Sequence, residues 1–587
     1  MAITCKIDGV DVCVPDGTSI LEAAKKVGVK IPALCYHSDL KPWAACGICV
    51  VKVVGSPKLI RACAVPAENG KEYITRDAEL VQARKEVLQL ILSNHPNDCL
   101  TCGRSANCEL QTLMADFGIR EQPFESGVEK MDKDESTEAI VLNPEKCIYC
   151  GRCVLACQDL QGVYALEFIG RGENTRLTPA AGAKLAESPC IKCGQCSAHC
   201  PVGGIYEKDD TAEVFAALSN PEKHCVVQVA PAVRVALGEA FGLKSGELLT
   251  GKMYAALRRL GFNKVFDTNF AADLTIMEEG TEFIHRFTKA KDELPLITSC
   301  CPAWVDYMEK FANDLIPNFS TCKSPQQMEG AMIKTYYAEK AGIDPKNIVV
   351  VSIMPCTAKK FEIHASEDMS SAVKGVKDVD VVITTRELAR MIKQTGIDIL
   401  AIAEEEVDPL LGTYSGAGTI FGVTGGVMEA ALRTAVAKMT GKELPKVEFE
   451  APRGTDGVKT AELDVAGTKV RIAVAHGMVN IEKVLNEIRA AKKAGKSGAD
   501  MPYHFIEVMA CRGGCVGGGG QPFGATEETR AKRTAGIYKD DEISKIRCSH
   551  LNPEVTAAYK DFLGEPCSDK SHKLLHRTYQ KRPLYTK

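Results

Sequence analysis

The chain has 587 residues and a formal net charge of −4, so it is too long for one hydrophobic core and too weakly charged for nucleic acid to be its main partner. Its composition is that of a globular protein, and it contains no run of about 18 apolar residues that would predict a membrane span. The 26 cysteines are the exception. Clustered cysteines in a large chain without an export signal indicate metal ligands, so we expect a cytoplasmic metalloprotein of three or more domains.

Residues 1–78 predict a small β-rich domain with a 2Fe–2S cluster. The dipeptide Asp8-Gly9 between two alternating segments indicates a β-hairpin, and a short helix is expected over 20–27. Four cysteines follow, and the central Cys-x2-Cys pair among them fits one iron: Cys35, Cys46, Cys49 and Cys63. The first two are ten residues apart, unlike the plant-type ferredoxin pattern, and a zinc ribbon is the alternative for this set.

Residues 79–130 predict a 4Fe–4S module with one histidine ligand. A helix with an apolar face is expected over 79–93, and it leads into three cysteines, one too few for a cluster: Cys99, Cys102 and Cys108. His95 is placed to supply the fourth ligand, as histidine replaces cysteine in other iron–sulfur sites. A surface or capping role is the alternative for this histidine.

A charged linker over 130–138 precedes the clearest motif, which occupies residues 139–215. Two runs of Cys-x2-Cys-x2-Cys-x3-Cys predict two 4Fe–4S clusters, because in this bacterial ferredoxin repeat the fourth cysteine of each run serves the other cluster. The first cluster is expected on Cys147, Cys150, Cys153 and Cys200, and the second on Cys157, Cys190, Cys193 and Cys196. The first run has Gln158 where a proline is usual. A series of clusters of this length indicates a conduit for single electrons.

Residues 220–540 have the alternating strands and helices of an α/β domain. Strands are expected at six apolar runs: 225–230, 264–267, 296–298, 348–353, 379–384 and 470–474. A dinucleotide site at Gly416-Ala-Gly418 is disfavoured, because the third glycine falls one place late and no acidic residue follows at the expected distance.

Three apolar runs, at 296–298, 348–353 and 505–509, deliver cysteines at their carboxyl ends, where open α/β sheets bind their ligands. Cys301, Cys356, Cys511 and Cys515 are four thiolates, enough for a further 4Fe–4S cluster, and the glycines after Cys515 allow a close approach of the backbone. Cys300 is expected on the opposite face from Cys301, since neighbouring side chains alternate in extended backbone. From the residues alone, solvated positions are favoured for Lys359 and for the carboxylates Glu278, Glu279 and Glu282.

The three cysteine segments resemble the three signatures of the iron-only (FeFe) hydrogenases. They are Thr298-Ser-Cys-Cys-Pro-Ala-Trp304, Met354-Pro-Cys-Thr-Ala-Lys-Lys-Phe-Glu362 and the glycine-rich segment from Glu507 to Pro522. The resemblance covers the whole chain, and the N-terminal motifs match the long members of the family. It implies a multidomain α+β and α/β fold with a β-grasp 2Fe–2S domain, a His-ligated 4Fe–4S module, a two-cluster bacterial ferredoxin domain and a two-lobed α/β domain.

The resemblance implies an H-cluster in addition to one 2Fe–2S and three accessory 4Fe–4S clusters. The H-cluster is a 4Fe–4S cubane joined to a diiron unit that carries CO, cyanide and a dithiolate bridge. Four cysteines would hold the cubane, the last of them as the bridging thiolate: Cys301, Cys356, Cys511 and Cys515. A proton path would run through Cys300, Glu279, Ser320 and Glu282. Lys359 would donate to one cyanide, and the pocket would be lined by Pro231, Met354 and Met509.

The implied activity is the reversible oxidation of H2 to protons and electrons. Its electrons would pass to ferredoxin or to flavin- and NAD(P)-binding partner subunits, and H-cluster maturation proteins would supply the diiron unit. We favour the catalytic subunit of a complex. A stand-alone ferredoxin-linked hydrogenase, a hydrogen sensor and an iron–sulfur assembly protein are the alternatives. Residues 541–587, which end in a basic stretch, are interpreted as a solvated extension that packs on the core or on a partner.

Overall fold

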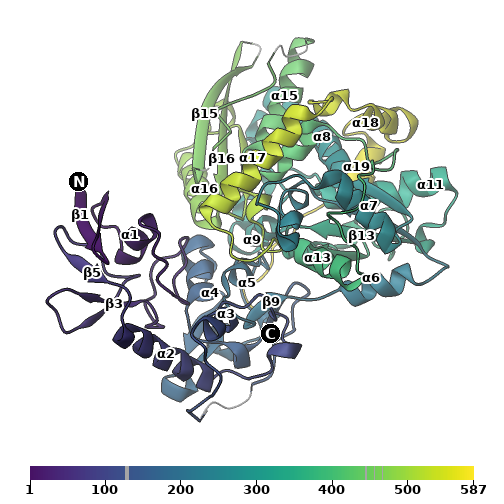
Figure 1. The fold of residues 1–587 in the computed structure, drawn as a ribbon. Coiled ribbons are helices and arrows are strands. Elements are labelled where there is room, and N and C mark those ends of the chain that lie inside the picture. Colours follow the sequence, from purple (N-terminus) through teal and green to yellow (C-terminus); the bar gives the residue numbers. More distant parts are fainter. Residues whose placement is uncertain (126–130, 443–445, 455, 466, 587) are drawn as a thin grey trace. The chain divides into compact units, whose positions relative to one another are not determined.

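The computed structural model describes residues 1–125, 131–442, 446–454, 456–465 and 467–586. They form two compact units (Figure 1). The first comprises Met1–Ser136, Ile140–Ser188 and His199–Tyr206, and the second comprises Thr137–Ala139, Pro189–Ala198 and Glu207–Lys587. Within the described ranges, no helix is both long and apolar enough to cross a membrane. All 26 cysteines lie in these ranges and none of them forms a disulfide.

The first unit begins with a five-stranded mixed sheet in the order β2-β1-β5-β3-β4. The strands are β1 (Ala2–Ile7), β2 (Val10–Pro15), β3 (Val50–Val53), β4 (Leu59–Arg61) and β5 (Glu72–Ile74). The predicted hairpin is confirmed, because β1 and β2 pair in antiparallel register around Asp8 and Gly9, which both have positive φ. The predicted helix is α1 (Ile20–Lys26), which buries Ile20 and Leu21 in the core of this domain.

The rest of the first unit consists of short elements between cysteine-bearing loops. The predicted helix before His95 is α2 (Ala78–Ser93), whose N-cap Asp77 accepts a hydrogen bond from Leu80 N at 2.8 Å. The others are α3 (Glu109–Asp116), β6 (Ile140–Leu142), α4 (Arg152–Leu155), β7 (Glu167–Ile169) and β8 (Arg176–Thr178). Two more, α5 (Gln195–His199) and β9 (Ile205–Glu207), have residues in both units.

The second unit contains two four-stranded sheets, each with its own hydrophobic core, which confirms the two-lobed α/β expectation. The first sheet is parallel, in the order β11 (Lys264–Asp267), β10 (His224–Val229), β13 (Ile348–Met354) and β14 (Val381–Thr384). The second has the order β12 (Leu296–Ile297), β17 (Phe505–Met509), β16 (Thr468–His476) and β15 (Val458–Val465). Only β15 is antiparallel to its neighbour in this sheet.

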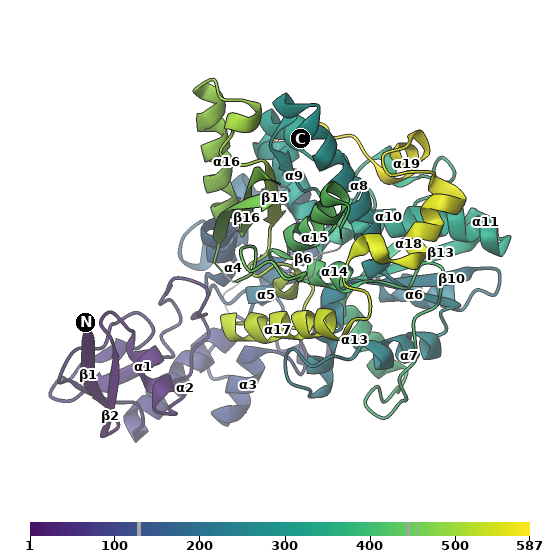
Figure 2. The ribbon, with the colours of Figure 1, turned by 90° about the horizontal axis from the view of Figure 1, so that it is seen from above.

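The long helix α8 (Thr268–Thr288) joins the two lobes of the second unit. Its residues Phe270 and Leu274 belong to the core of the first sheet, whereas Ile276 and Phe283 belong to the core of the second. Both faces of α8 are therefore buried, and the helix packs against α10 and α15 (Figure 2). The other helices before residue 500 are α6 (Thr211–Leu218), α7 (Thr250–Leu260), α9 (Pro302–Phe311), α10 (Pro325–Met332), α11 (Ala338–Ala341), α12 (Ala358–Glu362), α13 (Thr385–Gln394), α14 (Gly416–Thr419), α15 (Gly426–Thr440) and α16 (Met478–Lys493).

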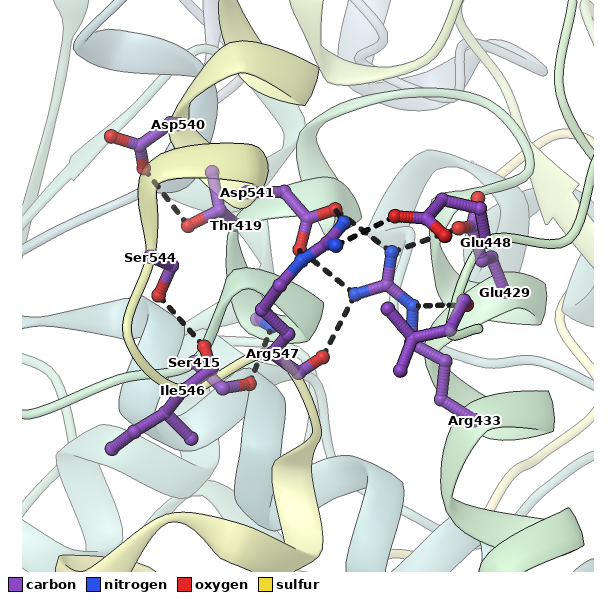
Figure 3. Close-up of polar contacts among 12 residues, drawn as sticks. Ser415, Thr419, Glu429, Arg433, Glu448, Asp540, Asp541, Ser544, Ile546 and Arg547 are labelled. Carbon is purple, nitrogen blue, oxygen red and sulfur yellow. Dashed lines mark hydrogen bonds and ion pairs between the residues drawn. The ribbon is translucent and has the colours of Figure 1, made fainter. Parts of the chain in front are cut away.

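The C-terminal segment, residues 527–586, is drawn in yellow in Figures 1 and 2. It packs on the rest of the second unit through α17 (Glu527–Ile543), α18 (Pro553–Ala558) and α19 (Asp569–Leu575). Its start is held by a buried ion-pair network in which Arg433 donates to Glu429 and Asp541 (Figure 3). Residues 541–586 pack on the core, as one of the two expected arrangements had it, but they are far less solvated than expected. Apolar residues at helical spacing, such as Val555, Leu574 and Leu575, are buried against the core of the first lobe.

Candidate metal centre

A cavity in the second unit lies where three strands end. It is lined by residues that follow β12, β13 and β17. Parallel strands present their carboxyl ends at one edge of a sheet, so the three cysteine segments converge there as the sequence predicted. The lining includes every predicted cysteine of the centre and the predicted pocket residues: Pro231, Cys300, Cys301, Met354, Cys356, Lys359, Met509, Cys511 and Cys515.

The four predicted cubane ligands form one group of thiols around this cavity, in which Cys511 is buried and the other three are half-buried. Burial and the neighbouring Cys301 raise the pKa of Cys356 and of Cys515 to about 12, and Lys359 acts in the opposite direction. Four thiolates this close repel one another unless positive charge lies among them. Iron supplies that charge when a cluster is bound, and the thiols release their protons to solvent as they bind the metal. The donor set, its burial and the cavity therefore fit a 4Fe–4S cluster with a further group beside it.

The glycines after Cys515 let two backbone segments touch. A Cβ atom on Gly518 would lie 2.1 Å from the carbonyl oxygen of Pro355, and one on Gly519 would lie 2.4 Å from that of Cys193. Both distances are far inside van der Waals contact, so only glycine fits. The loop after β17 is thereby packed between the Cys356 segment and the Cys193 segment, all within the second unit.

Substituting Gly518 by alanine should lower the melting temperature of the anaerobically purified protein and reduce its iron content. The new methyl group must push Pro355 aside, directly before Cys356, and overpacking of this kind costs about 1–3 kcal/mol. Gly280→Ala is the matched control, because a Cβ there meets nothing within 4 Å and alanine favours the helix. Equal melting temperatures and iron contents for the two variants would show that the close approach is not needed.

Both adjacent cysteines, Cys300 and Cys301, line the cavity, although alternation in extended backbone predicts opposite faces. The difference arises because the strand ends here. Cys301 is the N-cap of α9, and Pro302 is its first residue, so the chain turns from strand to helix between the two side chains. Burial and the nearby Glu279 carboxylate raise the pKa of the Cys300 thiol, which keeps its proton at neutral pH.

The carboxylates on α8 are buried, which corrects the expectation that they are solvated. Glu278 and Glu279 are at most 1% exposed, because α8 is covered on both faces. Burial and then the charge of Glu282 raise the pKa of Glu279 to about 8. Ser320 Oγ donates to Glu282 Oε2 at 2.8 Å, and Arg286 Nη2 donates to Glu282 Oε1 at 2.7 Å. The structure thus brings Cys300, Ser320 and Glu282 close to Glu279, and a proton path through them stays a prediction.

Lys359 is also buried rather than solvated. Its Nζ donates to Glu362 Oε2 at 2.9 Å and to the carbonyl oxygen of Cys300 at 3.2 Å. Burial opposes its charge, but the Glu362 carboxylate raises the pKa of Lys359, which stays a cation beside the cavity. Gln326, which no sequence motif predicted, lines the cavity and donates to Glu362 Oε2 at 3.0 Å. Its only sequence signal is its place in the first turn of α10, after Pro325.

Gln195 was missed as well, and it links two cysteine segments of the second unit. Its Nε2 donates to Cys511 Sγ at 3.3 Å and to the carbonyl oxygen of Gly517 at 3.0 Å. A hydrogen bond to a cysteine sulfur is one of the features that set the reduction potential of a cluster. Gln195 lies between Cys193 and Cys196, so the segment predicted to carry one cluster donates to a predicted ligand of another.

In the first unit, the four predicted 2Fe–2S ligands lie together. The sulfur of Cys35 is within hydrogen-bond distance of Cys46 and Cys63, and that of Cys49 is within the same distance of Cys63. Cys35, Cys49 and Cys63 are buried under the sheet and Cys46 is half-buried. A compact set of four sulfurs fits a 2Fe–2S cluster.

His95 lines a cavity of the first unit together with Cys99 and Cys108. Its Nδ1 lies 3.0 Å from the carbonyl oxygen of Pro96, and its buried Nε2 has no hydrogen-bond partner in the part of the chain that the structure describes. Burial lowers the pKa of His95, so the ring is neutral. An imidazole that donates a hydrogen bond through Nδ1 and has a free lone pair on Nε2 is suited to bind a metal through Nε2. Cys102, the third predicted cysteine, accepts a hydrogen bond from Arg104 N at 3.5 Å.

Part of the bacterial ferredoxin repeat lines another cavity of the first unit. Its lining contains the predicted crossed set: Cys147, Cys150, Cys153 and Cys200. The last of these comes from the second cysteine run, as the repeat predicts. Of the other set, Cys157 belongs to the first unit, whereas Cys190, Cys193 and Cys196 belong to the second, and this set stays a prediction.

Comparison with known proteins defines the class. The model of the iron-only hydrogenase large subunit, C-terminal domain, matches residues 223–519, and that of the iron hydrogenase small subunit matches 527–582. The first unit matches a 2Fe-2S iron-sulfur cluster binding domain at 1–77, an NADH-ubiquinone oxidoreductase-G iron-sulfur binding region at 84–123 and a 4Fe-4S binding domain at 140–159. The chain belongs to the family of iron-only (FeFe) hydrogenases.

Among individual relatives, the NADP-reducing hydrogenase subunit HndD of Solidesulfovibrio fructosivorans is 47% identical over 99% of both chains. Iron hydrogenase 1 of Clostridium pasteurianum is 39% identical over 98% of this chain and 100% of its own length. Among solved structures, a variant of apo [FeFe]-hydrogenase HydA1 from Chlamydomonas reinhardtii superposes with a TM-score of 0.56 at 42% identity, covering 64% of this chain and all of that one.

Proposed function

We propose that the chain catalyses the reversible oxidation of H2 to two protons and two electrons, at an H-cluster held by Cys301, Cys356, Cys511 and Cys515. The observation that carries the proposal is the single cavity at which these four thiols meet Cys300 and Lys359. The H-cluster supplies the redox chemistry at iron when it is bound. The protein must bind the cluster, exclude water and move protons and electrons.

The side chains around the cavity have separate tasks. Cys515 would be the thiolate that holds both parts of the H-cluster. Lys359, a buried cation held by Glu362, is placed to donate to a cyanide ligand. Pro231, Met354 and Met509 are buried apolar residues that exclude water from the pocket. Excluding water strengthens every electrostatic interaction inside the cavity.

Protons are proposed to move along Cys300, Glu279, Ser320 and Glu282. A carrier transfers protons efficiently when its pKa lies near the working pH, and the Glu279 carboxyl, with a pKa raised to about 8, meets that condition. Ser320 passes a proton to Glu282 through its 2.8 Å hydrogen bond. Arg286 holds Glu282 in place at the outer end of this row.

Electrons are proposed to travel through four accessory clusters, one 2Fe–2S and three 4Fe–4S. These lie in three modules: 1–78 with Cys35, Cys46, Cys49 and Cys63; 79–130 with His95, Cys99, Cys102 and Cys108; and 139–215 with the two crossed cysteine sets. Residues 220–540 form the catalytic domain, and 541–587 form a C-terminal extension of it. We place the protein in the cytoplasm, where free thiols persist.

The physiological partner is proposed to be a flavin- and NAD(P)-binding subunit, with this chain as the catalytic subunit of a complex. Two matches support this: the NADP-reducing name of the HndD relative, and the oxidoreductase-G region at 84–123. Transfer to ferredoxin is the second candidate, because the same row of clusters serves either acceptor. The sensor and assembly alternatives are disfavoured, because the proposed proton row is complete.

The test is H2-dependent reduction of three acceptors by the anaerobically matured chain: a viologen dye, ferredoxin and NADP+. For a catalytic subunit we expect reduction of the dye alone, with NADP+ reduction only after a flavoprotein partner is added. Rapid reduction of ferredoxin by the chain alone would replace the complex with a stand-alone enzyme. A chain with a full H-cluster that leaves the dye oxidised would overturn the hydrogenase proposal.

A further inference from the structure

A group of metal-ligating side chains lies in the C-terminal segment, outside the cavity described above. It consists of Cys567, His572 and His576, whose ligand atoms all lie within 4.8 Å of one another. The spacing is Cys-x4-His-x3-His, and the two histidines stand four residues apart at the end of α19, so their side chains lie on one face. Their ring centroids are 4.0 Å apart.

A carboxylate lies beside His576, one member of the group. Glu278 of α8 accepts a hydrogen bond from Cys567 N at 2.8 Å, and its Oε2 lies 3.0 Å from His576 Nε2. Two ligand atoms bound to one tetrahedral zinc ion at about 2.0–2.1 Å are about 3.3 Å apart, so a metal can replace the proton between these atoms with little movement. The hydroxyl oxygen of Thr321 lies 2.7 Å from His576 Nδ1 and can accept a hydrogen bond from Nδ1–H. In that tautomer the lone pair of Nε2 is free for a metal.

We propose that Cys567, His572, His576 and Glu278 bind one structural zinc ion. Sulfur, two imidazole nitrogens and a carboxylate oxygen are the ligand types that zinc takes in proteins, and four of them close a structural site. His572 is exposed and Cys567 is partly exposed, so the ion can enter from solvent, while His576 and Glu278 are buried beneath it.

The charges of the site favour a dication. Glu278 is held as a carboxylate by hydrogen bonds from Tyr559, Ser571 and Cys567 N. Burial and this carboxylate raise the pKa of Cys567 above its ordinary value, so without a metal the thiol keeps its proton. A zinc ion displaces that proton and neutralises both the thiolate and the carboxylate.

The site would fasten residues 567–576 onto α8 beside the proposed proton row. Glu278 is the neighbour of Glu279, and Thr321, which contacts His576, donates its backbone N–H to Glu282 Oε2 at 3.3 Å. The ion would thereby fix the structure around the outer end of that row without touching substrate. Its role is structural, and its effect on turnover is secondary to its effect on the order of the C-terminal segment.

Zinc content of the matured holoenzyme is the first measurement, by mass spectrometry of the metals after exhaustive dialysis. We expect one zinc per chain, with an X-ray absorption spectrum at the zinc edge that contains one sulfur at about 2.3 Å and nitrogen or oxygen at about 2.0–2.1 Å. The zinc edge is separate from that of iron, so the clusters do not interfere. A holoenzyme without zinc that binds none on addition of Zn2+, or one whose zinc has no sulfur neighbour, would overturn the proposal.

Variants locate the ion. Cys567→Ser and His572→Ala should each weaken zinc binding at least about tenfold in a chelator competition, and hydrogen exchange over 567–576 should increase. His572 is exposed, so its replacement leaves packing intact even if the cysteine variant folds poorly. Cys13→Ser and His285→Ala remove an exposed cysteine and an exposed histidine elsewhere and should keep the zinc. Full retention of zinc by the His572 variant would place the ion at another site and refute the assignment.

Discussion

Replacing Cys300 by alanine should lower H2 turnover by at least about a thousandfold while the iron content of the chain stays the same. The Cys300 thiol lines the cavity beside Glu279, and alanine cannot carry a proton between them. Proton transfer by a positioned side chain contributes about 10²–10⁴ to a rate. The measurement is the rate of viologen reduction under H2, with iron and the H-cluster spectrum determined on the same sample.

The control for this variant is Cys225→Ala. Cys225 is a buried cysteine of β10 outside the cavity lining, and its loss removes a thiol from the first-lobe core without touching the proton row. It should retain near-normal turnover. Equal activity in both variants, at full iron content, would mean that protons reach the centre without Cys300.

Replacing Arg433 by alanine should loosen the start of the C-terminal segment. Arg433 is fully buried between Glu429 and Asp541, and removing one partner of a buried ion pair costs about 3–5 kcal/mol because the other charge is left uncompensated (Figure 3). Arg453 still contacts Glu429 and Arg547 still contacts Asp541, so we expect the lower end, about 3 kcal/mol. Hydrogen exchange of peptides over 527–543 should then accelerate about a hundredfold.

A surface pair on the same helix provides the comparison. Lys532 and Glu528 of α17 form an ion pair at 2.6 Å in which both side chains are more than half exposed. Exposed pairs contribute about 0–1 kcal/mol, so Lys532→Ala should change exchange over 527–543 several-fold at most. A hundredfold change in both variants would indicate general loosening of α17 rather than loss of the buried network.

The sequence predicted the β-hairpin and the strands well, because their signals are local. Asp8-Gly9 defines a turn by itself, and an apolar run that ends in cysteine predicts both a buried strand and the edge at which the strand ends. The six predicted strands correspond to β10, β11, β12, β13, β14 and β16. The strand β15 was missed, because as the antiparallel edge strand of its sheet it lacks the continuous apolar run of a buried strand.

The burial of Glu278, Glu279 and Lys359 could not be predicted from local pattern. A helix that bears several charges normally turns them to solvent, and only the packing of α8 between two lobes buries both of its faces. Gln195 and Gln326 were missed for a related reason. Each acts through contacts with residues distant in the sequence, and nothing in a single glutamine indicates them.

The burial of both faces of α8 also determines how the second unit unfolds. Unfolding of either lobe would remove the partners of one face of α8, and the same helix supplies apolar side chains to the core of the other lobe. Neither lobe can therefore unfold while the other keeps its full stability, and the two behave as one cooperative unit. The proposed metal centre takes ligands from both lobes. We therefore expect the whole of its protein scaffold to unfold in one transition and not one lobe at a time.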